Sequence, residues 1–166
     1  MRTAIFAAAI GLAGIVALPS LAADHQVEML NRDSEGRTMQ FEPAFLKIEP
    51  GDTVTFVPTD PSHNSESIAN GIPEGAEPWK GRINEEITVT FDVEGVYAYK
   101  CLPHFAMGMV GLIQVGDDTS NLEAIRELSA PGRAAERLEE LVAELESGGG
   151  DDAADAATDG EAAPAE

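Results

Sequence analysis

Apolar and polar side chains alternate in several short segments between residues 24 and 115. The segment Thr53–Val57 reads Thr-Val-Thr-Phe-Val, and Ile87–Phe91 repeats this alternation, which is typical of a β-strand with one buried face. Other apolar segments of strand length occupy residues 27–30, 45–48, 96–100 and 110–115. Turn residues separate them, as in Glu49-Pro50-Gly51-Asp52, where Pro and Gly suit a type II turn. This part of the chain therefore predicts a mainly β fold, an antiparallel β-sandwich.

The hydrophobic period becomes helical after Gly116. Residues Ser120–Glu123 have the pattern of a capping box, with Ser120 as the N-cap and Glu123 reaching back to it. Further on, apolar residues at i, i+3, i+4 and i+7 predict a helix with one apolar face: Leu138, Leu141, Val142 and Leu145. We expect two C-terminal α-helices packed on the sandwich; a free interaction helix is the alternative.

The two ends of the chain differ from this domain. Arg2, an apolar run over residues 4–18, Pro19 and the small residues before Asp24 predict a signal peptide over residues 1–23. The run is too short to span a bilayer, although a retained anchor is the alternative. Cleavage after Ala22 and cleavage after Ala23 are both compatible with the pattern. We therefore expect export to the periplasm and no membrane span after cleavage.

Composition sets the remaining boundaries and excludes one class of partner. One domain is expected over residues 24–146, followed by an acidic tail over residues 147–166 that we expect to be disordered, because it lacks aromatic and β-branched aliphatic side chains. The formal net charge of the chain is -20. Nucleic-acid binding is disfavoured, because it requires clustered Lys and Arg to neutralise phosphates.

The candidate chemistry centres on Cys101, the one cysteine of the chain. The stretch Cys101-Leu-Pro-His-Phe-Ala-Met-Gly-Met109 and the upstream His63 offer a thiolate, two imidazoles and a thioether, the ligand set of a blue-copper site. Met107 and Met109 are both spaced to be the axial ligand; Gly108 and the strand that follows favour Met109. Structural zinc sites usually have four Cys or His ligands, so zinc is the weaker alternative, as is a metal-free core cysteine.

Several stretches together resemble the pseudoazurin family of cupredoxins, over about residues 24–142. They are Phe41-Glu-Pro-Ala-Phe45, Pro50-Gly-Asp-Thr-Val-Thr-Phe56, Ser62-His-Asn64, Ile72-Pro-Glu-Gly-Ala-Glu77 and the Cys101–Met109 stretch. The resemblance implies a cupredoxin-like Greek-key sandwich with two C-terminal helices. It also implies one copper ion cycling between Cu(I) and Cu(II), with His63, Cys101, His104 and Met109 as ligands. Around these, Asn64 would join the two ligand loops and Met39 would pack near His104; Pro103, Phe105 and Met107 would surround the ligands.

The function expected from this resemblance is electron transfer, without enzymatic turnover. Pseudoazurins exchange electrons in transient complexes with redox proteins, here a c-type cytochrome as donor and a denitrification enzyme such as copper nitrite reductase as acceptor. Arg32, Lys80, Arg82 and Lys100 are the candidate docking cations, and the protein is expected to be a monomer. A copper carrier or buffer without an electron-transfer role is the alternative.

Overall fold

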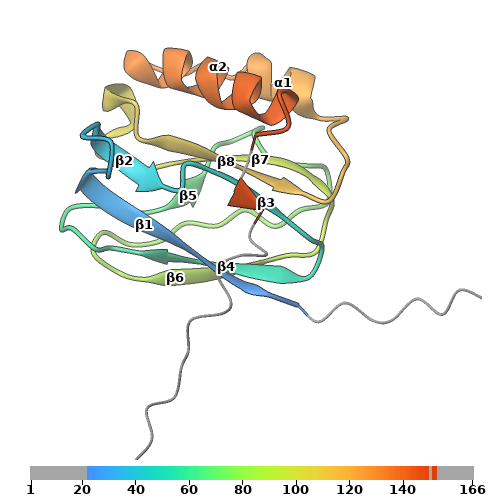
Figure 1. The fold of residues 1–166 in the computed structure, drawn as a ribbon, viewed down its shortest axis with the longest axis horizontal. Coiled ribbons are helices and arrows are strands. Elements are labelled where there is room, and N and C mark those ends of the chain that lie inside the picture. The colour runs from blue at the N-terminus through green and yellow to red at the C-terminus, as the bar shows by residue number, and fades with distance from the viewer. Residues whose placement is uncertain (1–21, 150, 153–166) are drawn as a thin grey trace, which may run out of the picture.

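The computed structural model describes residues 22–149 and 151–152 as two facing β-sheets with helices on one side (Figure 1). The first sheet has the strand order β2-β1-β4-β6. Its strands are β1 (Asp24–Arg32), β2 (Thr38–Glu42), β4 (Asp52–Val57) and β6 (Ile87–Phe91).

The second sheet has the order β5-β7-β8-β3-β9 and carries the helices on its outer face. Its strands are β3 (Phe45–Ile48), β5 (Glu66–Ser67), β7 (Gly95–Lys100), β8 (Val110–Val115) and β9 (Asp151–Asp152). The helical elements are η1 (Phe105–Met107), α1 (Leu122–Arg126) and α2 (Arg133–Glu146).

The predicted mainly β sandwich with two helices is confirmed, but its sheets are mixed. The pairs β1–β4, β3–β8 and β3–β9 are parallel, whereas the other strand pairs are antiparallel. Side-chain alternation identifies the buried face of a strand and carries no information about the direction of its neighbour. Strand β2 was not predicted, although its sequence Thr-Met-Gln-Phe-Glu alternates polar and apolar residues; the chain then crosses to the second sheet at Pro43.

Two hydrophobic cores hold the layers together. The core between the sheets includes Phe41, Phe56 and Tyr99 and extends to Cys101 and Met109. The core between the second sheet and the helices contains the four apolar residues that the sequence placed on one helix face, Leu138, Leu141, Val142 and Leu145. The helix is therefore part of the domain rather than a free interaction helix.

The predicted capping box at Ser120 is wrong. Helix α1 has Asn121 as its N-cap residue and no side-chain capping bond. The Ser120 backbone N–H and hydroxyl instead donate to the carboxylate of Asp118, at 2.8 and 3.1 Å. A local turn around an Asp side chain competes with helix initiation, so the helix begins later, at Leu122.

The structure describes both ends of the expected domain and a short piece of the expected tail. Helix α2 ends at Glu146, and Asp151–Asp152, which belong to the segment expected to be a disordered tail, pair in parallel with β3. The expected signal peptide, apart from Ala22 and Ala23, and the tail from residue 153 lie outside the described residues. Among the residues that are described, no helix combines the length and the apolar composition needed to cross a bilayer.

Candidate metal centre

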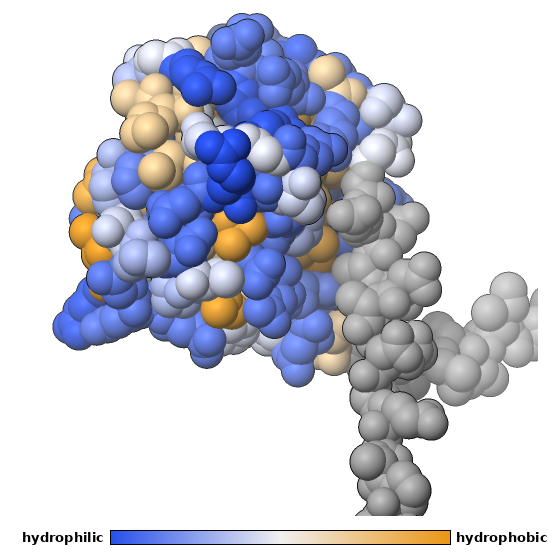
Figure 2. Space-filling view, turned by 60° about the vertical axis from the view of Figure 1, so that its left-hand side comes forward, coloured by the Kyte–Doolittle hydropathy of each residue, from blue (hydrophilic) through white to orange (hydrophobic). Residues whose placement is uncertain are grey.

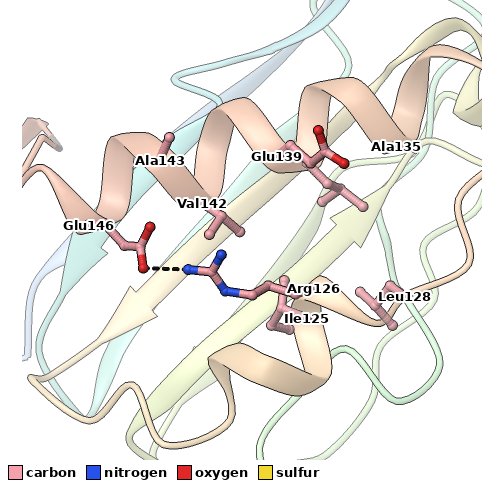
Figure 3. A pocket seen from close by; sticks show the side chains of 9 residues that line it. Ile125, Arg126, Leu128, Ala135, Glu139, Val142, Ala143 and Glu146 are labelled. Carbon is pink, nitrogen blue, oxygen red and sulfur yellow. Dashed lines mark hydrogen bonds and ion pairs between the residues drawn. The ribbon is translucent and has the colours of Figure 1, made fainter.

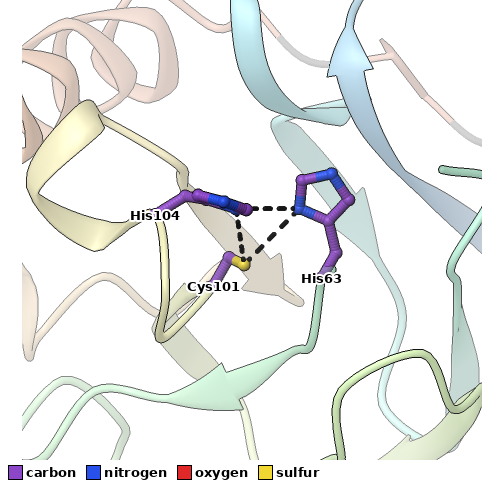
Figure 4. Close-up of side chains that lie close together, drawn as sticks. All are labelled: His63, Cys101 and His104. Carbon is purple, nitrogen blue, oxygen red and sulfur yellow. Dashed lines mark hydrogen bonds between the residues drawn. The ribbon is translucent and has the colours of Figure 1, made fainter. Parts of the chain in front are cut away.

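The side chains of three potential metal ligands lie close together (Figure 4). His63 lies on the connection between β4 and β5, Cys101 directly follows β7, and His104 precedes η1. Their ligand atoms all lie within 4.8 Å of one another. The Sγ atom of Cys101 is 3.6 Å from Nδ1 of each histidine, and the two Nδ1 atoms are 3.1 Å apart. Two loops far apart in the sequence thus direct one sulfur and two nitrogens to a common point.

The second of these loops is closed by its own backbone. The N–H of Cys101 donates to the carbonyl of Met109 at 3.0 Å, and the N–H of Met109 donates to the carbonyl of His104 at 3.3 Å. Strands β7 and β8 pair Lys100 with Val110 on either side. Gly108 adopts φ 97°, a conformation that costs glycine little. The loop therefore returns directly into the sheet with Met109 at its end.

The two methionines of this loop have different environments. Met109 is fully buried and belongs to the same core as Cys101, whereas the Met107 side of the loop faces solvent, with Met107 43% exposed. An axial thioether has to lie inside the protein next to the thiolate, so burial favours Met109 over Met107.

The orientation of His63 is set by a residue that the sequence did not single out. Nε2 of His63 lies 3.1 Å from Oδ1 of Asn31, at the end of β1. The N–H of Asn31 donates to the carboxylate of Asp60 at 2.7 Å. Since an amide oxygen only accepts, Nε2 carries the proton and Nδ1 keeps its lone pair. The bond leaves Nδ1 free to bind a metal.

Burial favours the neutral form of His63, which can bind a metal ion. At Cys101 it disfavours the thiolate, which is the form that binds a metal ion. Burial and the neighbouring His104 lower the pKa of His63, and Asp60 acts against them. Burial raises the pKa of the Cys101 thiol, although backbone hydrogen bonds from Asn64 and His104 oppose this shift. A coordinated thiol is held as the thiolate. A buried set of one soft sulfur and two imidazoles fits copper, which would replace the thiol proton.

The residues predicted around the ligands occupy different places. The Asn64 side chain joins the loops, because its Oδ1 accepts from the Leu102 N–H at 2.8 Å. Met39 packs against the core that contains Cys101 and Met109. Phe105 lies beneath the Lys100 ammonium, with 4.9 Å from Nζ to the ring centroid. Pro103 is exposed on the same loop.

Three of the four candidate docking cations have carboxylate partners. Lys80 and Lys100 both face Glu66, and Arg82 faces Glu85 at 3.6 Å. Arg32 is exposed and donates to the carbonyl of Gly36. Glu66 itself is buried and was not noted in the sequence, since a single Glu in a polar loop carries no signal of its burial.

A separate groove of about 410 Å³ lies between α1 and α2 (Figure 3). Its lining is apolar apart from Arg126, Glu139 and Glu146, and Arg126 pairs with Glu146 across it. The groove belongs to the helical layer, away from the His63, Cys101 and His104 cluster.

Comparison with known proteins agrees with this site. A family model described as copper binding proteins of the plastocyanin/azurin family matches residues 27–116. The pseudoazurin of Paracoccus pantotrophus is 50% identical over 130 residues, which cover 78% of this chain and 89% of that protein. The pseudoazurin of Methylorubrum extorquens is 41% identical over 145 residues, covering 87% and 97%. The crystal structure of Hyphomicrobium denitrificans pseudoazurin aligns with a TM-score of 0.69 at 50% identity, covering 73% of this chain and 97% of that one.

The fold and the copper-type ligand cluster define a cupredoxin, and by these matches the chain belongs to the pseudoazurins within the plastocyanin/azurin family. It is a blue-copper electron carrier and not an enzyme, and it holds one copper ion. When bound, the copper ion supplies the one-electron chemistry between Cu(II) and Cu(I).

Proposed function

We propose that this protein shuttles electrons in the periplasm to a denitrification enzyme such as copper nitrite reductase, and receives them from a c-type cytochrome. Its copper ligands are His63, Cys101, His104 and Met109. The observation that carries the proposal is the convergence of three ligand atoms within 4.8 Å, with His63 and Cys101 buried and His104 only half-buried. One ligand edge is thus open to a partner while the rest of the site is closed.

The partner contact is centred on His104. Leu102 and Met107 flank it on the same loop and are 50% and 43% exposed. In Figure 2, where the left-hand side of Figure 1 comes forward, the surface is mostly hydrophilic and its apolar side chains form small separate groups. A small apolar contact within a polar surface suits a transient redox complex, which typically buries less than about 1,200 Å².

Charge steers this encounter only locally. The exposed cations Arg32, Lys80 and Arg82 act over a Debye length of about 8 Å at physiological salt, and the net charge of -20 acts against an acidic partner. Arg82→Gln should therefore slow electron transfer to copper nitrite reductase at low salt and have little effect at high salt. Arg126→Gln, on helix α1, is the control and should leave the electron-transfer rate unchanged at both low and high salt. Equal effects of the two substitutions would contradict this docking site.

A copper carrier would need an exchangeable site, and the burial of His63 and Cys101 opposes this alternative. The decisive experiment is stopped-flow oxidation of the reduced copper protein by the reductase. The proposal requires a second-order reaction that returns the blue absorption; transfer of the metal ion without re-oxidation would support the carrier instead.

Export places the protein with these partners, and Ala23 suggests where processing occurs. The backbone N–H of Ala23 donates to Asp52 at 2.8 Å, and its carbonyl accepts from the Thr53 N–H at 2.9 Å. Ala23 is therefore an extension of β1 on β4. We propose that cleavage falls between Ala22 and Ala23, which keeps these bonds. The mass of the exported protein tests this, with Ala23 as the expected first residue and Asp24 as the contrary result.

A further inference from the structure

Glu66 is a buried carboxylate close to the metal centre that the copper ligands do not use. It lies on the edge strand β5, paired with Lys100 of β7, and forms an isolated bridge with Lys80. The residue is only 6% exposed. A carboxylate in such a place is stable only when charges and hydrogen bonds compensate its lost hydration.

The two cations that face Glu66 are not equivalent. Nζ of Lys100 lies 3.4 Å from Oε1, and the Lys100 side chain is 19% exposed. Nζ of Lys80 lies 3.8 Å from Oε2, and its side chain is 74% exposed. Solvent screens the Lys80 pair, so Lys100 is the principal counter-ion. Its ammonium also lies over the ring of Phe105, the neighbour of the ligand His104.

Glu66 also contacts the amide group that joins the two ligand loops. Its Oε2 accepts from Nδ2 of Asn64 at 3.4 Å, and the same Nδ2 donates to the carbonyl of Gly81 at 3.1 Å. With Nδ2 fixed in this way, Oδ1 of Asn64 points to the Leu102 N–H. Asn64 follows the ligand His63 and Leu102 follows the ligand Cys101, so the contact reaches both loops through one side chain.

We propose that Glu66 is a positioning residue for the copper centre. It fixes Asn64 between the ligand loops, holds Lys100 against Phe105 and keeps a negative charge near the Cys101 thiolate. The negative charge of Glu66 should change the reduction potential of the copper centre in one direction. A nearby negative charge stabilises the more positive state of a site, here Cu(II), and so lowers the reduction potential. Lys100 balances this charge and thus acts within the scaffold rather than as a docking cation. The electrostatic part of the proposal rests on the copper electron-transfer function.

The test compares Glu66→Gln with Glu85→Gln. Both remove one carboxylate that faces a cation, but the Glu85 side chain is exposed and faces Arg82. In Glu66→Gln, the equilibrium between Cu(II) and Cu(I) at a fixed applied potential should move toward Cu(I) by about tenfold. Glu85→Gln should move it by much less. Lys100→Gln, which leaves Glu66 without its counter-ion, should move it toward Cu(II).

A second readout needs no copper. In the metal-free protein, amide hydrogen exchange at Leu102 should be faster in Glu66→Gln than in the wild type, and unchanged in Glu85→Gln. Equal potentials for both Gln variants together with unchanged Leu102 exchange would overturn the proposal. A protein that binds no copper would instead refute the electron-transfer function, and the exchange measurement would still decide whether Glu66 positions Asn64.

Discussion

Nε2 of His63 lies 3.1 Å from Oδ1 of Asn31, so that a strand of the first sheet orients a metal ligand on the loop that connects the two sheets. Only the imidazole nitrogen opposite this bond, Nδ1, faces the Cys101 sulfur. Groups that hold the second nitrogen of a ligand histidine fix its tautomer and ring orientation.

Asn31→Ala should therefore weaken copper binding. We expect a loss of about tenfold in Cu(II) affinity, at the lower end for such groups because Asn31 is exposed and water can replace it in part. Competition with a chelator at neutral pH measures this. Asn31→Asp keeps an acceptor oxygen at the same position and should bind copper nearly as well as the wild type; an Asp variant as weak as the Ala variant would contradict the role of the bond.

Leucine substitutions separate the two methionines of the ligand loop. Met109→Leu should alter the visible and EPR spectra and raise the reduction potential, because the weak axial thioether donor is lost from a buried position. Met107→Leu should leave the spectra unchanged, since that side chain is exposed and does not belong to the core that contains Cys101. The reverse pattern would make Met107 the axial ligand.

The buried pair of His25 and Asp52 joins β1 to β4 and predicts a pH dependence of stability. Their Nε2 and Oδ2 atoms are 2.8 Å apart. Burial by itself raises the pKa of Asp52, but hydrogen bonds from the Ala23 N–H, His25 and the Glu49 N–H outweigh burial and lower the pKa below 3.8. A lowered carboxyl pKa stabilises the fold above the unfolded-state value, and this stability is lost as the pH falls through the folded-state pKa.

Asp52→Asn should therefore reduce the free energy of unfolding by about 1–3 kcal/mol at pH 6. The difference from the wild type should shrink as the pH falls below 3.8. Asp24→Asn is the matched control, because Asp24 is exposed and its carboxylate accepts from the Thr53 hydroxyl. Urea unfolding at pH 6 and below pH 3.8 measures the free energy of unfolding of both variants and the wild type. A difference for Asp52→Asn that does not change with pH would argue against the Asp52 carboxylate as its cause.

Gly132 connects the helical layer to the ligand loop. It has φ 57°, and a Cβ atom there would lie 2.5 Å from the carbonyl oxygen of Ala106, in η1 between His104 and Met109. Gly132→Ala should destabilise the protein by about 3 kcal/mol and perturb the copper spectrum. Gly148→Ala, with φ 72° and open space around it, should cost about 1 kcal/mol and leave the spectrum intact. Thermal unfolding and visible absorption of both variants check this.

The sequence predicted the features that depend on local patterns or on a specific motif. Alternation located β4 and β6, and helical spacing identified the buried face of α2. The Cys101–Met109 stretch and the upstream His63 supplied the three potential metal ligands that the fold brings together. The parallel pairings and the turn at Ser120 were missed, since they depend on the direction of distant strands or on competing local hydrogen bonds.

The groups that support the ligands were the least predictable part of the site. Asn31 lies 32 positions from His63, and Glu66 faces Lys100 only once β5 has paired with β7, so both contacts depend on the folded sheets. Neither residue stands in a motif. Asn64 was within reach of the sequence because it adjoins His63 and because the family resemblance implied its role.

The most direct test of the central claim is the visible and EPR spectrum of the purified protein after Cu(II) addition, recorded before and after ascorbate. The structure predicts an intense blue thiolate-to-copper absorption band that ascorbate bleaches and re-oxidation restores, and that Cys101→Ser abolishes. A colourless protein without a reversible one-electron response would contradict the assignment of His63, Cys101, His104 and Met109 as a blue-copper centre.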